Sequence, residues 1–176
     1  MCTFNTLLLP ASTSLDRVNA VARELGWGLF AAQGNPSIEA AVADALSYVR
    51  ADGGCDCGSG LATADTTPYI GWSDGEVRKL NADGWSATKI ERWKAQREAA
   101  RAKVANPAQP TVPAQWCTLL ERLLDGRIAA WVGVFTHDYR GALGSRITCK
   151  PVQRFSGVTV GRLSAIETDV PYVFAR

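Results

Sequence analysis

Apolar positions in the first part of the chain switch between strand-like and helical spacing. Residues 3–9 are β-prone and predict a strand. Residues 15–25 carry apolar side chains at helical spacing, with Ser12 or Thr13 available as the helix cap. Residues 27–32 return to the β-prone pattern, so we expect an N-terminal β-α-β unit.

The middle of the chain favours helices. Asn35-Pro36 combines a cap with a first-turn proline, and it predicts a second helix over 38–49. The clearest helical pattern covers 86–104. Three prolines follow within 106–113, which indicates a stiff, extended connection.

The last third of the chain is expected to be rich in β-structure. A short helix is predicted over 115–124. The expected strands cover 127–136, 146–152, 157–163 and 172–174. We therefore predict an α+β fold, with a mainly antiparallel sheet and helices packed on one face. Residues 1–176 are expected to form a single domain, with the basic helix and Pro-rich connection at about 85–113.

The composition adds few constraints on function. The chain is 47% apolar and 20% charged, and its net charge of +2 is too small to indicate a polyanionic partner. No apolar stretch approaches the roughly 20 residues that cross a bilayer, and the first residues lack the basic region of a signal peptide. Together with an odd number of cysteines, five, this favours a reducing, cytoplasmic location and no membrane partner.

The most informative motif is a pair of cysteines within the glycine-rich segment 53–60. Cys55 and Cys57 are separated by one residue, and a third thiol, Cys2, follows Met1. Zinc takes four thiolate or imidazole ligands. The expected set is Cys2, Cys55, Cys57 and His137, with Cys149 or Cys117 as alternatives to the histidine. A zinc or small-ligand site is thus predicted, with no other cofactor, although Cys55 and Cys57 could equally be small apolar residues without a role.

The same residues suggest an enzyme as an alternative. Cys57 would lie among backbone N–H groups that can stabilise an oxyanion, which suits a cysteine-dependent hydrolase or acyl transferase. Cys2 could serve as the nucleophile if Met1 were removed. His137 would then be the base, and the acidic residue beside it, Asp138, is more typical of a turn than of a catalytic pair.

A third alternative is an interaction module based on the basic helix 86–104. The segment Glu76 to Lys103 contains eight basic and four acidic residues, with Trp85 and Trp93 among them. Such a helix could contact a protein partner. The balance of the whole chain disfavours nucleic acid, and a solvated charged face explains the segment adequately.

Two short motifs are similar to those of a group of proteins. Met1-Cys2-x-Phe4 and Cys55-Asp56-Cys57-Gly58 resemble elements shared by small uncharacterised bacterial proteins. The resemblance covers roughly the first third of the chain. It implies no activity.

Overall fold

The computed structural model describes residues 2–32, 34–51, 56, 61, 74–104 and 112–176. The chain divides into two compact units. We call Met1–Thr66 with Thr111–Arg176 the sheet unit, and Thr67–Pro110 the helical unit.

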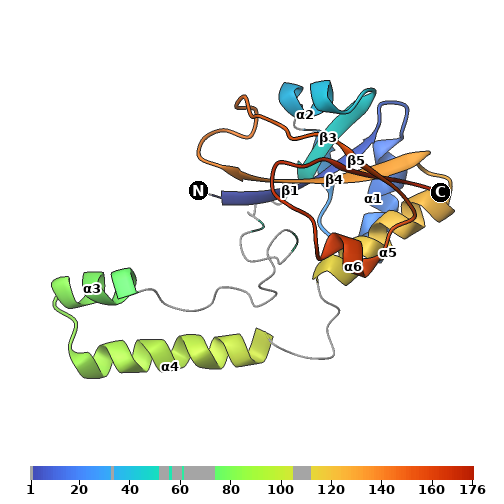
Figure 1. The fold of residues 1–176 in the computed structure, drawn as a ribbon. Helices are drawn as coiled ribbons and strands as arrows, with labels where there is room; N and C mark the ends of the chain where they lie inside the picture. The colour runs from blue at the N-terminus through green and yellow to red at the C-terminus, as the bar shows by residue number, and fades with distance from the viewer. Residues whose placement is uncertain (1, 33, 52–55, 57–60, 62–73, 105–111) are drawn as a thin grey trace. The chain divides into compact units, whose positions relative to one another are not determined.

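The sheet unit is built on a single sheet, to which the described residues contribute six strands in the order β2-β3-β1-β4-β6-β5 (Figure 1). The strands are β1 (Cys2–Pro10), β2 (Phe30–Ala32), β3 (Ala45–Arg50), β4 (Trp131–Tyr139), β5 (Gln153–Ser156) and β6 (Tyr172–Ala175). Neighbouring strands are antiparallel except β5 and β6, which are parallel. The long central strands β1 and β4 pair from Cys2 opposite Tyr139 to Leu8 opposite Gly133.

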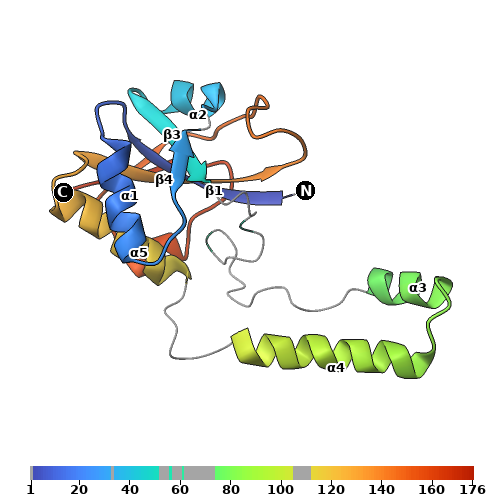
Figure 2. The same cartoon turned by 180° about the vertical axis from the view of Figure 1, so that it is seen from behind.

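Helices cover both faces of this sheet (Figures 1 and 2). One face carries α1 (Leu15–Glu24), α5 (Val112–Asp125) and α6 (Val160–Leu163), and we call it the α5 face. The other carries α2 (Pro36–Ala41), and we call it the α2 face. Because side chains alternate along a strand, Leu7 and Leu9 of β1 pack on the α5 face, whereas Leu8 packs on the α2 face.

These observations confirm the predicted α+β class, the mainly antiparallel sheet and the N-terminal β-α-β unit. The helices were expected on one face only, but α2 packs on the other, because Leu8 and Phe135 give the sheet a second apolar face. The helices predicted over 15–25, 86–104 and 115–124 are present as well. The N-cap of α1 is Ser14 rather than the predicted Ser12 or Thr13.

Three of the predicted elements were wrong. The helix predicted over 38–49 ends at Ala41, and Asp44, with φ of 60°, turns the chain into β3, which pairs with β1. The strand predicted over 146–152 is irregular, because Ile147 N–H donates to the Ser37 side chain and Lys150 N–H to the Asp169 carbonyl. The strand predicted over 157–163 contains α6 instead, because the Thr159 side chain caps a helical turn.

The helical unit contains α3 (Asp74–Ala82), which the sequence patterns did not predict, and α4 (Ala87–Val104). Ile90 is buried between charged residues of α4. Two cations of this helix lie over indole rings, Lys89 over Trp85 at 3.8 Å and Arg97 over Trp93 at 4.6 Å. That this helix contacts a partner stays a prediction. No helix in the described part of the chain is both long and apolar enough to cross a membrane.

Candidate functional site

The first turn of α2 organises a polar site on the α2 face of the sheet. Asn35 is buried and caps the helix by accepting a hydrogen bond from Ser37 N–H at 3.0 Å. Its Nδ2 donates to the Leu143 carbonyl at 2.7 Å and to the Tyr139 hydroxyl at 3.3 Å. A single cap residue therefore ties the helix to the end of β4 and to the loop that follows it.

Ser37 binds a later part of the loop that follows β4. Its hydroxyl accepts from Ile147 N–H at 3.1 Å, and its carbonyl oxygen accepts from the Cys149 thiol at 3.6 Å. The loop over residues 140–149 is thus held to α2 although it forms no helix or strand of its own.

His137 lies on β4 on this face, and its ring is paired with a carboxylate. Nδ1 lies 2.5 Å from Oδ1 of Asp169. A carboxylate on Nδ1 fixes the orientation of the ring and leaves Nε2 to interact with a ligand. No described residue forms a hydrogen bond with Nε2.

The backbone at Asp169 is unusual and explains how its carboxylate reaches the imidazole. Its φ is 67°, in the left-handed region that Asp tolerates better than most residues. Its N–H donates to the Thr136 carbonyl at 2.9 Å, and its own carbonyl accepts from Lys150 N–H at 2.7 Å. These two bonds hold a strained residue against β4, as is common at functional sites.

Aromatic rings fix the imidazole on its remaining sides. The Tyr139 ring meets it edge-on with 4.5 Å between centroids, and the Phe135 ring is stacked at 6.2 Å. Phe4, opposite His137 in the β1–β4 register, packs against Tyr139. His137 is therefore held rigidly, with the exposed fraction of its side chain at 19%.

His137, Tyr139 and Asp169 line a cleft of about 510 Å³, which we call the His137 cleft. This volume is within the usual range for small-molecule sites. Its other lining residues include Asp138, Arg140, Ser145, Arg146 and Thr148. Both carboxylates are already engaged, since Asp169 binds His137 and Asp138 accepts a hydrogen bond from Thr3 at 2.6 Å. By contrast, neither Arg140 nor Arg146 forms an ion pair with a described residue.

Two weak acids beside the cleft are kept neutral. Burial raises the pKa of Tyr139, an effect opposed by the hydrogen bond from Asn35 and assisted by the nearby Asp169 carboxylate. Burial also raises the pKa of the Cys149 thiol, and the nearby Asp169 carboxylate adds to the effect. Cys149 is consequently a poor candidate for a thiolate nucleophile near neutral pH.

Of the predicted cysteine ligands, some lie within the described residues and some do not. Cys55 and Cys57 lie outside the described residues. Cys2 is exposed at the start of β1, opposite Tyr139, so its side chain shares the α2 face with His137. Cys117 is buried within α5 on the opposite face of the sheet, which removes it as an alternative ligand beside His137. No three potential metal-ligating side chains cluster within the described part of the chain.

Asp56, the residue between the two undescribed cysteines, is fixed to β1. Its N–H donates to the Thr3 carbonyl at 2.7 Å, and its carboxylate accepts from Asn5 N–H at 2.8 Å. Arg50 forms an ion pair with the same carboxylate at 2.8 Å. Asp56 is therefore held against the edge of β1 by bonds to the backbone of that strand.

The sequence singled out His137 as a candidate residue, but it did not indicate which residues surround it. His137 belongs to β4 rather than to a turn after the strand, and its partner is Asp169, not the adjacent Asp138. Adjacent residues of a strand face opposite sides of a sheet, which is why Asp138 cannot serve. Asn35 was predicted only as a helix cap, and no sequence signal marks Arg140, Arg146 or Asp169.

Comparison of the chain with protein-family profiles, curated proteins and solved structures gave no match. The assignment of a function therefore depends on the geometry of the site.

Proposed function

We propose that the chain binds a small anionic ligand, a carboxylate or a phosphate, in the His137 cleft. The observation that carries the proposal is an imidazole oriented by Asp169 in a cleft lined by Arg140 and Arg146, neither of which forms an ion pair with a described carboxylate. Guanidinium groups bind carboxylate and phosphate through paired, charge-assisted hydrogen bonds. Nε2 of His137 would contact the same ligand.

Calorimetric titration with inorganic phosphate and with succinate tests this proposal. We expect saturable binding of at least one of them at low ionic strength. Arg140→Gln and Arg146→Gln should each weaken binding by about tenfold or more, since a hydrogen bond to a charged group contributes about 1.5–3 kcal/mol.

Arg154→Gln provides a matched control. Arg154 is also an exposed arginine, but it lies on the edge strand β5, away from the lining of the cleft. Affinity should be unchanged in this variant. Equal loss in all three variants, or no binding of either anion, would refute the proposal.

Zinc binding is the second candidate, with Cys2, Cys55, Cys57 and His137 as ligands. Two observations favour it. A carboxylate on the far nitrogen of a histidine is the usual arrangement around metal-ligating imidazoles, and Asp169 supplies it here. Asp56, which lies between Cys55 and Cys57 in the sequence, is bound to Thr3 and Asn5 of β1, the strand that carries Cys2.

The zinc candidate is tested by equilibrium titration of chelator-treated protein. It predicts one zinc ion per chain, and at least tenfold weaker binding in Cys2→Ser, Cys57→Ser and His137→Gln. Cys117→Ala is the control, because Cys117 is buried in α5. Absence of stoichiometric zinc would exclude this candidate and leave the anion proposal untouched.

Cysteine-dependent catalysis would require a reactive thiol near His137. Of the three cysteines in the described part of the chain, only Cys2 is exposed. Mass spectrometry after brief iodoacetamide treatment should then show much faster alkylation of Cys2 or Cys57 than of Cys149. Uniformly slow alkylation of all five cysteines would exclude this chemistry.

A further inference from the structure

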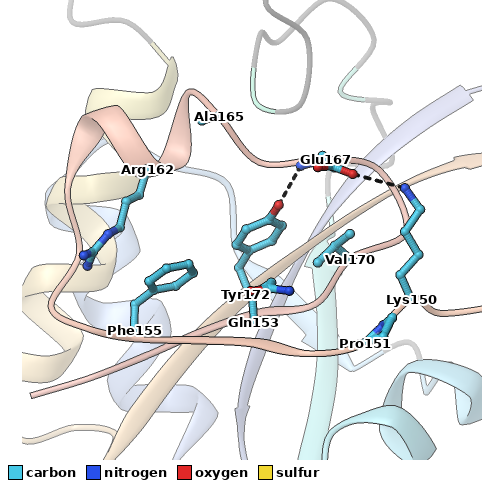
Figure 3. Close-up of a pocket in the computed structure, with 9 residues that line it drawn as sticks. All are labelled: Lys150, Pro151, Gln153, Phe155, Arg162, Ala165, Glu167, Val170 and Tyr172. Carbon is cyan, nitrogen blue, oxygen red and sulfur yellow. Dashed lines mark hydrogen bonds and ion pairs between the residues drawn. The ribbon is translucent and has the colours of Figure 1, made fainter.

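A second hollow, of about 480 Å³, lies on the α5 face beside β5 (Figure 3). It is bounded below by β5 and β6 and above by α6 and the segment that follows it, with Arg162 and Lys150 toward its two ends. It shares no lining residue with the His137 cleft. It is therefore a distinct candidate site, and we call it the Phe155 groove.

Aromatic and aliphatic side chains form the floor of the groove. The rings of Phe155 and Tyr172 are nearly parallel, at 7°, with 6.2 Å between centroids. Val170 lies beside Tyr172 in the view of Figure 3. The Tyr172 hydroxyl accepts a hydrogen bond from Glu167 N–H at 3.0 Å, so the ring is fixed and its polar end is already engaged. A floor of this kind favours a flat apolar ligand.

Arg162 is a preorganised cation at one end of the groove. Its guanidinium lies 4.6 Å from the centre of the Phe155 ring, and Nη1 donates to the carbonyls of Ser156 and Gly157 at 3.0 and 3.3 Å. No described carboxylate forms an ion pair with it. At the other end, Lys150 is already paired with Glu167 at 3.3 Å.

We infer that the Phe155 groove binds a small, flat aromatic molecule that carries one acidic group. The ring would lie on the floor formed by Phe155, Tyr172 and Val170. The acidic group would pair with the remaining N–H groups of Arg162, whose orientation is set before a ligand arrives. An aromatic carboxylate and a nucleoside monophosphate share this chemistry.

Methyl NMR spectroscopy of the intact chain tests this inference, because Ala165 and Val170 both line the groove. Indole-3-acetate represents the aromatic carboxylates and adenosine 5′-monophosphate the nucleoside monophosphates. Their uncharged counterparts are 3-methylindole and adenosine. We expect saturable shifts of the Ala165 and Val170 methyl signals with at least one acid, and at least tenfold weaker binding of its uncharged counterpart. The acid that binds shows which of these two ligand classes the groove accepts.

Variants then separate the roles of charge and ring. Arg162→Gln should weaken binding of the acid by about tenfold, and Phe155→Leu should weaken binding of the acid and of the uncharged molecule alike. Arg154→Gln is the matched control, since Arg154 belongs to the same strand but faces the opposite side of the sheet. If Arg162→Gln fails to fold, Arg162→Lys retains the charge without the planar fork, and it should give an intermediate loss.

Two results would overturn the inference: no shift with either acid, or equal affinity for the acids and their uncharged counterparts. The Ala165 and Val170 shifts should persist in Arg146→Gln, which disrupts the His137 cleft alone. A lack of ligand binding in the Phe155 groove can therefore be distinguished from a lack of anion binding in the His137 cleft.

Discussion

At the scale of single residues, Asp169 is the clearest case of local strain serving a site. Its left-handed backbone, with φ of 67°, is the geometry that brings its carboxylate to His137. Asp169→Gly and Asp169→Ala both remove the carboxylate, but only alanine retains a Cβ in the left-handed region. We expect Asp169→Ala to have a free energy of unfolding about 1 kcal/mol below that of Asp169→Gly in urea titrations. Equal stabilities would show that the backbone at this position is unstrained.

Cys117 allows a prediction about pH. Burial raises its pKa to about 11, from an ordinary value of 9.0, with smaller contributions from Glu121. The folded chain thus keeps this thiol protonated at a pH where the unfolded chain ionises it. The resulting stability is fully present below pH 9 and is lost as pH rises toward 11.

Chemical denaturation between pH 8 and 11 tests this statement. The parent protein should lose up to about 2–3 kcal/mol more stability over this range than Cys117→Ala, in which no thiol titrates. An identical pH dependence in the two proteins would contradict the assignment.

Among the site residues, only those that carry a local signal could be predicted from the sequence. His137 was identified because it is the sole histidine, and Asn35 because Asn-Pro marks a helix start. Asp169 could not be identified, because it is 32 residues from His137 and reaches it only through tertiary structure. The same holds for Asp56, whose contacts with Thr3 and Asn5 depend on how the chain returns to β1.

At the scale of elements, the pairing of β4 with β1 and β6 depends on a residue without a side chain. A Cβ at Gly133 would lie 2.8 Å from the Tyr172 carbonyl oxygen and 3.1 Å from Leu8 Cβ. Gly133→Ala should therefore force the strands apart and lower the free energy of unfolding by about 1–3 kcal/mol. Gly161→Ala in α6 is the control, because nothing lies within 4 Å of its Cβ position. Comparable stability of the two variants would contradict this account of the sheet.

Elements with unambiguous periodicity, such as α1, α4 and α5, were predicted correctly. The errors occurred where the signal used for the prediction was outweighed by another interaction. Residues 45–49 fit a helical pattern, but pairing of Leu46 with Leu9 and of Tyr48 with Leu7 places them in a strand. In α6, the Thr159 cap outweighs the β-propensity of Val158 and Val160.

At the scale of the whole molecule, the sheet unit has a core of its own. Its two apolar clusters contain no described residue of the helical unit. Loop closure costs little extra when a connection is changed in length. Replacing residues 74–104 by a short Gly-Ser linker should leave the urea midpoint of the sheet unit within about 0.3 M of the parent. Loss of cooperative unfolding would show that the helical unit contributes to this core.

The His137 cleft belongs to the sheet unit, so its ligand binding should also survive that replacement. A shift of the phosphate or succinate affinity by more than a few-fold would assign part of the site to residues 74–104. The measurement is the calorimetric titration already proposed for the parent chain.

The most direct test of the His137 cleft uses a property of the sequence itself. The chain contains one histidine, so the imidazole signals in a proton NMR spectrum report on His137 alone. During titration with phosphate or succinate at constant pH, these signals should shift and saturate together with the calorimetric isotherm. In Arg146→Gln, the anion concentration that produces half of the shift should be at least tenfold higher. Imidazole signals that stay fixed while an anion saturates the protein would place binding elsewhere and contradict the account.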